Sequence, residues 1–214
     1  MTDYRFTKFE IYNYSGVMQE KIVLGDEIDT KAINSVGQHY DKIKRKDLTY
    51  YDRFEEIYHH KCAYCGVGTI INPAPLYEID HFFNKKQKTF GEENISVDHI
   101  SNPIFACRNC NQAKKEFDVS SIHDATHPDT EEIGRVFNRG NHFEIEISKE
   151  YYANEKIQYF YNKMNFGYRF RKLDYLLLNL YSLKEKTPYQ GRYERLFNKL
   201  LELRNTVPSL KKYE

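Results

Sequence analysis

Apolar residues recur along this chain with changing periods, and the changes predict where strands and helices lie. Two runs rich in apolar and aromatic residues, 4–14 and 17–24, are separated by a Ser-Gly turn. This pattern predicts a β-hairpin. From about residue 30 to residue 60 the apolar positions follow helical spacing instead, with members at Ile33, Val36, Tyr40 and Ile43. We therefore expect the N-terminal quarter to form a hairpin followed by helix.

The middle of the chain changes to short β-prone segments. An apolar run at residues 76–83 predicts a strand, and a polar, lysine-rich turn follows it. A second apolar run at residues 102–106 predicts another strand, and the residues after it are typical of a helix. The expected order in this region is therefore strand, loop, strand, helix.

The C-terminal part returns to helical spacing. Residues 142–147 alternate between apolar and polar, which predicts a half-exposed strand. From residue 149 onward three apolar helix faces follow one another, with Pro188 and Pro208 as breaks. The pattern predicts an α+β fold in three regions: 1–58 with a hairpin and helices, a central module at 59–120, and 121–214 with a linker, a strand and helices that dock a partner.

Four cysteines are the strongest chemical signal in the sequence. They form two C-x-x-C pairs, Cys62 with Cys65 and Cys107 with Cys110, and the chain contains no other cysteine. Two such pairs supply the four sulfurs of a tetrahedral zinc site. A redox dithiol would account for one pair but not for two. We therefore expect a structural Zn²⁺ ion that holds together the two ends of the intervening segment.

Charge and hydropathy restrict the class of protein. The 214-residue chain has 32 Lys and Arg against 31 Asp and Glu, a net charge of +1. The charge is uneven, because residues 151–214 contain 13 basic and 6 acidic side chains. No run approaches the roughly 18 apolar residues of a membrane span, and the first residues do not resemble a signal peptide. These observations favour a cytoplasmic protein with no membrane partner.

The residues from Cys62 to about Lys115 resemble a known family. A C-x-x-C pair, Asp80-His81 at a strand end, Asn102 before a short apolar run, and a final C-x-x-C-N-x-x-K follow one another in that order. This order is similar to that of HNH endonucleases with a ββα-metal fold and zinc knuckles. The resemblance covers about a quarter of the chain and implies a metal-dependent nuclease that cleaves nucleic acid, with DNA as the expected substrate.

The resemblance also implies a role for each residue. His81 would act as the general base, for which its ordinary pKa near 6.5 is suitable. Asp80 and Asn111 would hold a catalytic Mg²⁺, an ion that accepts two protein oxygens and several waters. Asn102 would fix the loop and orient His81.

Two further points depend on this alignment. Three basic residues at or after the second cysteine pair, Arg108, Lys114 and Lys115, are candidates for contact with the flanking phosphates. A second Asp-His pair, Asp98-His99, lies just before Asn102 and is an alternative to Asp80-His81. We favour Asp80-His81 because an apolar strand precedes it.

Three functional hypotheses follow. The first is a metal-dependent endonuclease, and the second is a non-catalytic zinc module that binds nucleic acid or protein. The third is a nuclease subunit that stays silent until a partner releases it. The layout is weakly similar to the HNH subunits of Septu-type and retron-linked antiphage defence systems, which implies an ATPase partner and a role as effector. The near-zero net charge also favours a partner, because a free-standing nuclease needs a basic surface.

Overall fold

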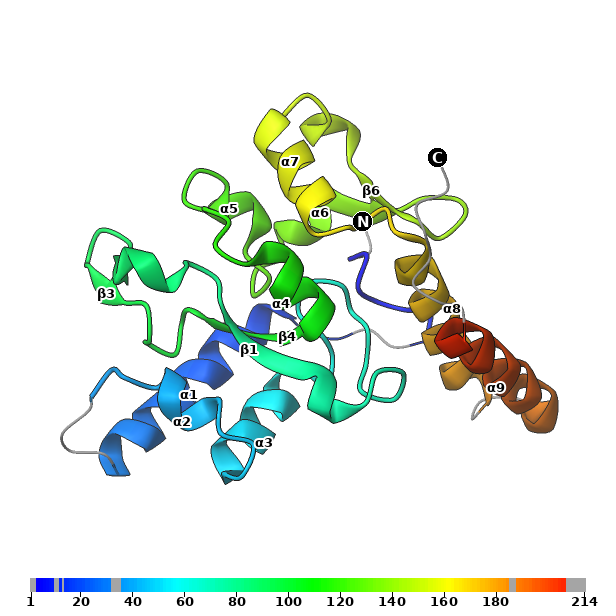
Figure 1. The fold of residues 1–214 in the computed structure, drawn as a ribbon, viewed down its shortest axis with the longest axis horizontal. Helices are drawn as coiled ribbons and strands as arrows, with labels where there is room; N and C mark the ends of the chain where they lie inside the picture. The colour runs from blue at the N-terminus through cyan, green and yellow to red at the C-terminus, as the bar shows by residue number, and fades with distance from the viewer. Residues whose placement is uncertain (1–2, 10–11, 13, 32–35, 185–187, 207–214) are drawn as a thin grey trace.

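The fold is α+β, with small two-stranded sheets between helices. The computed structural model describes residues 3–9, 12, 14–31, 36–184 and 188–206. In Figure 1 the strand pair β1 and β4 lies between the N-terminal helices on one side and α4 on the other, while α8 and α9 lie together at the edge of the molecule.

The predicted hairpin is wrong, because its second run is helical and the described residues of its first run contain no strand; residues 10, 11 and 13 lie outside the described residues. Its elements are η1 (Tyr14–Gly16), α1 (Val17–Lys31), α2 (Tyr40–Ile43) and α3 (Thr49–Ile57). The run at 17–24 lies inside α1, whose buried residues include Val17, Lys21, Leu24 and Ile28. These positions are three and four residues apart, which is the spacing of one helix face. The buried lysine at position 21 had concealed that spacing.

The single helix expected over residues 30–60 is also wrong. Within residues 36–60, α2 and α3 are separate short helices with turns before, between and after them, and Val36 is 67% exposed. Gly37 follows with φ +74°, a left-handed conformation that interrupts a helix. Ile33, which was placed on the same helix face, lies outside the described residues.

The central order of strand, loop, strand and helix is confirmed. Strand β1 (Tyr77–His81) pairs antiparallel with β4 (Pro103–Cys107), and α4 (Arg108–Lys114) follows directly. A short helix, η2 (Ala74–Leu76), precedes β1. The connection between the strands contains η3 (Lys85–Gln87) and a second strand pair, β2 (Thr89–Phe90) and β3 (Ile95–Ser96). The pairing places the ends of β1 and β4 beside the start of α4.

The C-terminal region contains the predicted strand and helices. Its first elements are α5 (His123–Thr126), α6 (Ile133–Val136), β5 (Phe137–Arg139) and β6 (Ile145–Ile147), with β5 and β6 paired. They are followed by η4 (Lys149–Tyr151), α7 (Glu155–Lys163), α8 (Arg169–Lys184) and α9 (Gln190–Thr206). The strand is shorter than predicted, because residues 142–144 belong to the turn before it.

One hydrophobic core includes residues from all three predicted regions, among them Tyr4, Phe105 and Phe160. The proposed boundaries at 58/59 and 120/121 therefore stay a prediction. None of the helices in the described ranges combines the length and apolar character needed to cross a membrane.

Candidate functional site

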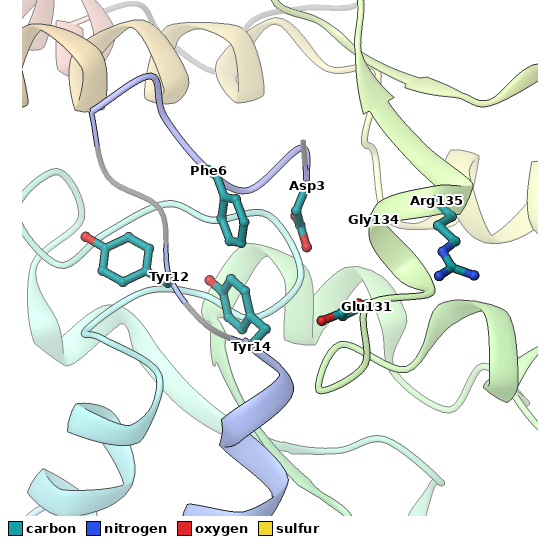
Figure 2. A pocket seen from close by; sticks show the side chains of 7 residues that line it. All are labelled: Asp3, Phe6, Tyr12, Tyr14, Glu131, Gly134 and Arg135. Atoms are coloured by element: carbon teal, nitrogen blue, oxygen red, sulfur yellow. The ribbon is translucent and has the colours of Figure 1, made fainter. Parts of the chain in front are cut away.

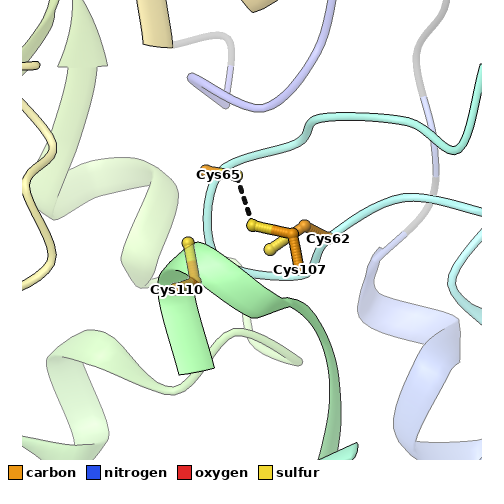
Figure 3. A group of neighbouring side chains, drawn as sticks. All are labelled: Cys62, Cys65, Cys107 and Cys110. Atoms are coloured by element: carbon orange, nitrogen blue, oxygen red, sulfur yellow. Dashed lines mark hydrogen bonds between the residues drawn. The ribbon is translucent and has the colours of Figure 1, made fainter. Parts of the chain in front are cut away.

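The two cysteine pairs meet at one point, as the spacing predicted. Cys62 and Cys65 lie on a tight turn that Gly66 completes with φ +74°, and Cys107 and Cys110 lie at the end of β4 and in α4. Figure 3 shows the four side chains turned toward a common centre. A side chain at position 66 would collide with the backbone of Arg5, so the turn requires glycine sterically as well as conformationally.

The geometry of the cluster suits a metal ion such as zinc. All four cysteines are free and buried, and their sulfur atoms lie within 4.8 Å of one another. The Cys65 and Cys107 sulfurs are 3.9 Å apart, close to the roughly 3.8 Å edge of a tetrahedron with Zn–S bonds of about 2.3 Å. Burial raises the pKa of the Cys65 and Cys110 thiols, whereas hydrogen bonds from the other three cysteines lower that of Cys107. A bound cation would stabilise the remaining thiolates.

A buried cation lies beside the cluster, and no pattern in the sequence indicated it. Arg171 in α8 is buried, and its Nη2 donates to the Cys110 sulfur at 3.1 Å while its Nη1 lies 3.9 Å from the Cys107 sulfur. Burial lowers the pKa of Arg171, but the four cysteine sulfurs raise it by more, and the guanidinium stays charged. A zinc ion with four thiolates has a net charge of −2, which Arg171 halves.

His81 is the last residue of β1 and forms a hydrogen-bonded pair with Asp98. Its Nε2 lies 2.7 Å from an Asp98 carboxylate oxygen, and the Tyr40 ring packs on the imidazole at 3.9 Å between centroids. The backbone N–H groups of His39 and Tyr40 both donate to the Asp98 carbonyl oxygen, which fixes the acid in place. Burial lowers the pKa of His81, so the ring is neutral near pH 7.

The two candidate Asp-His pairs therefore contribute one residue each to this contact. Asp98 faces His81, whereas His99 turns away, with its Nδ1 2.7 Å from the Ser101 hydroxyl and its ring against His39. Neither the Asp98 contact nor the Tyr40 contact was expected. The only signal in the sequence was the second Asp-His pair itself.

Asp80 precedes His81 in β1 and is held by two buried donors. The Tyr64 hydroxyl donates to its carboxylate at 2.6 Å, and the Lys114 ammonium lies 3.0 Å from the same oxygen. Burial raises the pKa of Asp80, while Lys114 and Tyr64 act in the opposite direction. The expectation that Lys114 contacts a phosphate is wrong, because its side chain is fully buried and also donates to the His81 carbonyl oxygen.

This buried pair leads to a stability prediction. Replacing Lys114 by methionine leaves the Asp80 carboxylate buried without its cation, which costs about 3–5 kcal/mol in the free energy of unfolding. Urea denaturation at pH 7 measures this loss. Lys115→Met is the matched control, because Lys115 is the exposed neighbour and its loss should change stability by less than about 0.5 kcal/mol. Equal stability of the two variants would contradict the importance of the pair.

A surface cavity of about 210 Å³ brings the predicted catalytic residues together. Its lining includes Asp80, His81 and Asn111, with Lys85 and Lys115 among the residues around them. Asn111 donates from Nδ2 to the Glu78 carboxylate at 2.6 Å, which leaves its Oδ1 free to accept. Hard oxygen donors from Asp80 and Asn111 thus lie at the same cavity as the imidazole.

Asn102 is fully buried and holds both ends of the loop that follows β1. Its Oδ1 accepts from the Phe83 N–H at 2.8 Å, and its Nδ2 donates to the carbonyl oxygens of Phe83 at 3.0 Å and Val97 at 2.7 Å. Because Phe83 follows His81 by two residues and Val97 precedes Asp98, this single amide fixes the spacing between His81 and Asp98.

Arg108 and Lys115 are both exposed, and Arg108 Nε lies 3.6 Å from a Glu78 oxygen.

A separate cavity of about 380 Å³ lies near the N-terminus, lined by the side chains in Figure 2. Its lining residues are Asp3, Phe6, Tyr12, Tyr14, Glu131, Gly134 and Arg135. None of the residues predicted to act chemically is among them, so the cavity at His81 is the candidate site.

Comparisons of the whole chain with protein-family models, with curated proteins and with solved structures found no match in any of the three.

Proposed function

We propose that this protein is a metal-dependent HNH-type endonuclease that hydrolyses phosphodiester bonds in nucleic acid, with DNA as the expected substrate. The observation that carries the proposal is the meeting of Asp80, His81 and Asn111 at one cavity. These residue types supply a base and two oxygen ligands, the minimum for one-metal phosphodiester hydrolysis. The cysteine cluster lies at the end of β4 and the start of α4, where it holds the cavity walls in place.

The contact with Asp98 gives His81 the tautomer that a base requires. When the Nε2–H donates to Asp98, the Nδ1 atom is left as the free acceptor. His81 then takes a proton from a water at Nδ1 while that water's oxygen bonds to phosphorus and the bond to the leaving 3′ oxygen breaks. Packing against Tyr40 limits rotation of the ring.

Asp80 and Asn111 would hold the catalytic ion. The Glu78 carboxylate orients the Asn111 amide, and the Lys114 ammonium fixes the Asp80 carboxylate. A bound Mg²⁺ supplies polarisation of the phosphoryl oxygen and stabilisation of charge on the leaving oxygen. Lys85 and Lys115, which also line the cavity, would bind the phosphate from the solvent side.

The paired acid predicts a shift in the pH profile. A general base acts when deprotonated, so the cleavage rate rises with pH through the His81 pKa and is flat above it. Burial lowers that pKa and Asp98 raises it, so Asp98→Asn should move the acidic limb to lower pH. Loss of the charged hydrogen bond also lowers the plateau about tenfold. Single-turnover rates between pH 5 and pH 8.5 measure both effects, and an upward shift of the limb would contradict the assignment.

One experiment tests the function directly. The purified protein is incubated with supercoiled plasmid and with an RNA of similar length, with and without added Mg²⁺ and in the absence of a chelator that would remove zinc from the cysteine cluster. Nicking or linearisation in Mg²⁺ alone supports the nuclease. If neither substrate is cleaved, with or without the products of neighbouring genes, the proposal fails and the non-catalytic zinc module gains support. The role as effector beside an ATPase subunit stays a prediction, which activation by such a subunit would test.

A further inference from the structure

A second cavity lies next to the one at His81. It has a volume of about 380 Å³ and is lined in part by Lys44, Arg45 and Lys46. Tyr40, Ile79 and Asn111 line both cavities. Because three residues are common to the two, the cavities adjoin each other, and we refer to them together as the depression. Asp80 and His81 line the first cavity, and Asn111 lines both.

The cations of the second cavity lie on one turn. Lys44, Arg45 and Lys46 are consecutive residues on the connection between α2 and α3, outside the segment that resembles an HNH module. The side chains of Lys44 and Arg45 are 45% and 56% exposed. Lys44 pairs with Asp41 at 2.5 Å and Arg45 with Asp47 at 2.8 Å. Exposed pairs of this kind are weak because solvent and salt screen them, so an incoming phosphate can displace them.

The charge balance along the depression differs from that of the chain as a whole. Six cations line the two cavities, namely Lys44, Arg45, Lys46, Lys85, Lys86 and Lys115, against the three acids Glu78, Asp80 and Glu116. The chain as a whole has a net charge of only +1. Two further acids, Asp41 and Asp47, lie outside the lining and pair with Lys44 and Arg45. The cations on both sides of Asn111 become available to a polyanion when its phosphates displace these exposed pairs.

We propose that the turn formed by Lys44, Arg45 and Lys46 binds the nucleic-acid backbone one or more phosphates away from the bond to be cleaved. This inference rests on the proposed function, because it places the scissile phosphate at His81. Lys85 and Lys115 hold the backbone on one side of that phosphate, and the turn holds it on the other. The binding surface therefore extends beyond the central module and includes the N-terminal region.

The test is the salt dependence of binding, measured with no added Mg²⁺ so that cleavage does not interfere, and with no chelator so that the cysteine cluster keeps its metal. A labelled duplex and a labelled single strand are each titrated with wild type, with the triple variant Lys44→Ala/Arg45→Ala/Lys46→Ala and with the control triple Arg135→Ala/Lys149→Ala/Lys156→Ala. Each lost phosphate contact reduces the slope of log K against log salt by about 0.9 for duplex and about 0.7 for single strand. The cavity triple should therefore reduce it by about 2–3.

The control removes the same number of exposed charges from α6, η4 and α7. It should leave the slope within about 0.5 of wild type. Equal slopes for the cavity triple and wild type would overturn the inference, as would an equal reduction in the control. Circular dichroism verifies folding, and if the triple variant is unfolded, the single substitution Arg45→Gln should still reduce the slope by about 1.

The two proposals fail separately. If wild type cleaves plasmid but the cavity triple keeps the wild-type slope, the nuclease stands and the turn is not part of its surface. If no cleavage occurs but the slope falls, the turn binds nucleic acid and the nuclease assignment is wrong.

Discussion

Replacing Cys110 by serine is expected to unfold the region around the cysteine cluster. Binding of zinc to four thiolates contributes about 10–16 kcal/mol of folding free energy in small zinc domains, which is as large as the whole stability of a typical domain. The variant loses one ligand and leaves the Arg171 guanidinium, whose Nη2 lies 3.1 Å from the Cys110 sulfur, buried beside a hydroxyl. We expect the cooperative thermal transition to be lost, or its midpoint temperature to fall by more than about 15 °C.

Ala113→Ser is the matched control for this experiment. It adds a hydroxyl to the same helix, α4, without altering the cluster, and should melt close to wild type. Elemental analysis of wild type should give about one zinc per chain, and a strong chelator should reproduce the unfolding seen in the variant. A structural role for the cluster would be excluded if Cys110→Ser unfolded at the same temperature as wild type. It would also be excluded if wild-type protein without bound metal unfolded at the same temperature as the metal-bound protein.

Replacing His81 by alanine should abolish most of the cleavage. Loss of a general base costs about 10²–10⁴-fold in rate, measured as single-turnover cleavage at saturating Mg²⁺. The imidazole contacts Asp98 and the Tyr40 ring, and its side chain is 10% exposed. The substitution therefore also leaves a small gap, and a thermal melt must show that the variant is folded before its rate is compared.

His99→Ala is the matched control for the base. His99 belongs to the alternative Asp-His pair, but it faces His39 and the Ser101 hydroxyl rather than the cavity. Its loss should change the rate less than about threefold, roughly the effect of 0.6 kcal/mol. The opposite outcome, an active His81→Ala and an inactive His99→Ala, would transfer the base to the second pair.

The sequence predicted those parts of the fold that depend on local spacing. The two C-x-x-C pairs, the strand at Tyr77–His81 and the C-terminal helices could be found because a fixed residue interval produces each of them. The N-terminal helix α1 was missed because Lys21, a charged residue, occupies a core position in it. Its ammonium lies 2.6 Å from a carboxylate oxygen of Asp129, 108 residues away, and no local pattern could indicate that pairing.

In the candidate site, too, the sequence predicted what depends on local order and missed contacts between distant residues. Asp80, His81 and Asn111 were found by their order in the chain, and they do line one cavity. Asp98 and Arg171 were not assigned their contacts, because only the folded chain brings them to His81 and to the cysteine sulfurs. Lys114 was misplaced because a lysine four residues after a cysteine on a helix has the same spacing whether it is buried or exposed.

The buried Asn102 amide has a consequence for how this chain can change length. Phe83 and Val97 both hydrogen-bond to the Asn102 side chain. The thirteen-residue loop between them therefore begins and ends at fixed positions. Its tip at residues 91–94 is exposed, and nothing lies within 4 Å of a side chain placed at Gly91. Lengthening a closed loop costs only about 0.6 kcal/mol for each doubling. An epitope or a fluorescent reporter can therefore be inserted at the tip while His81 and Asp98 keep their separation.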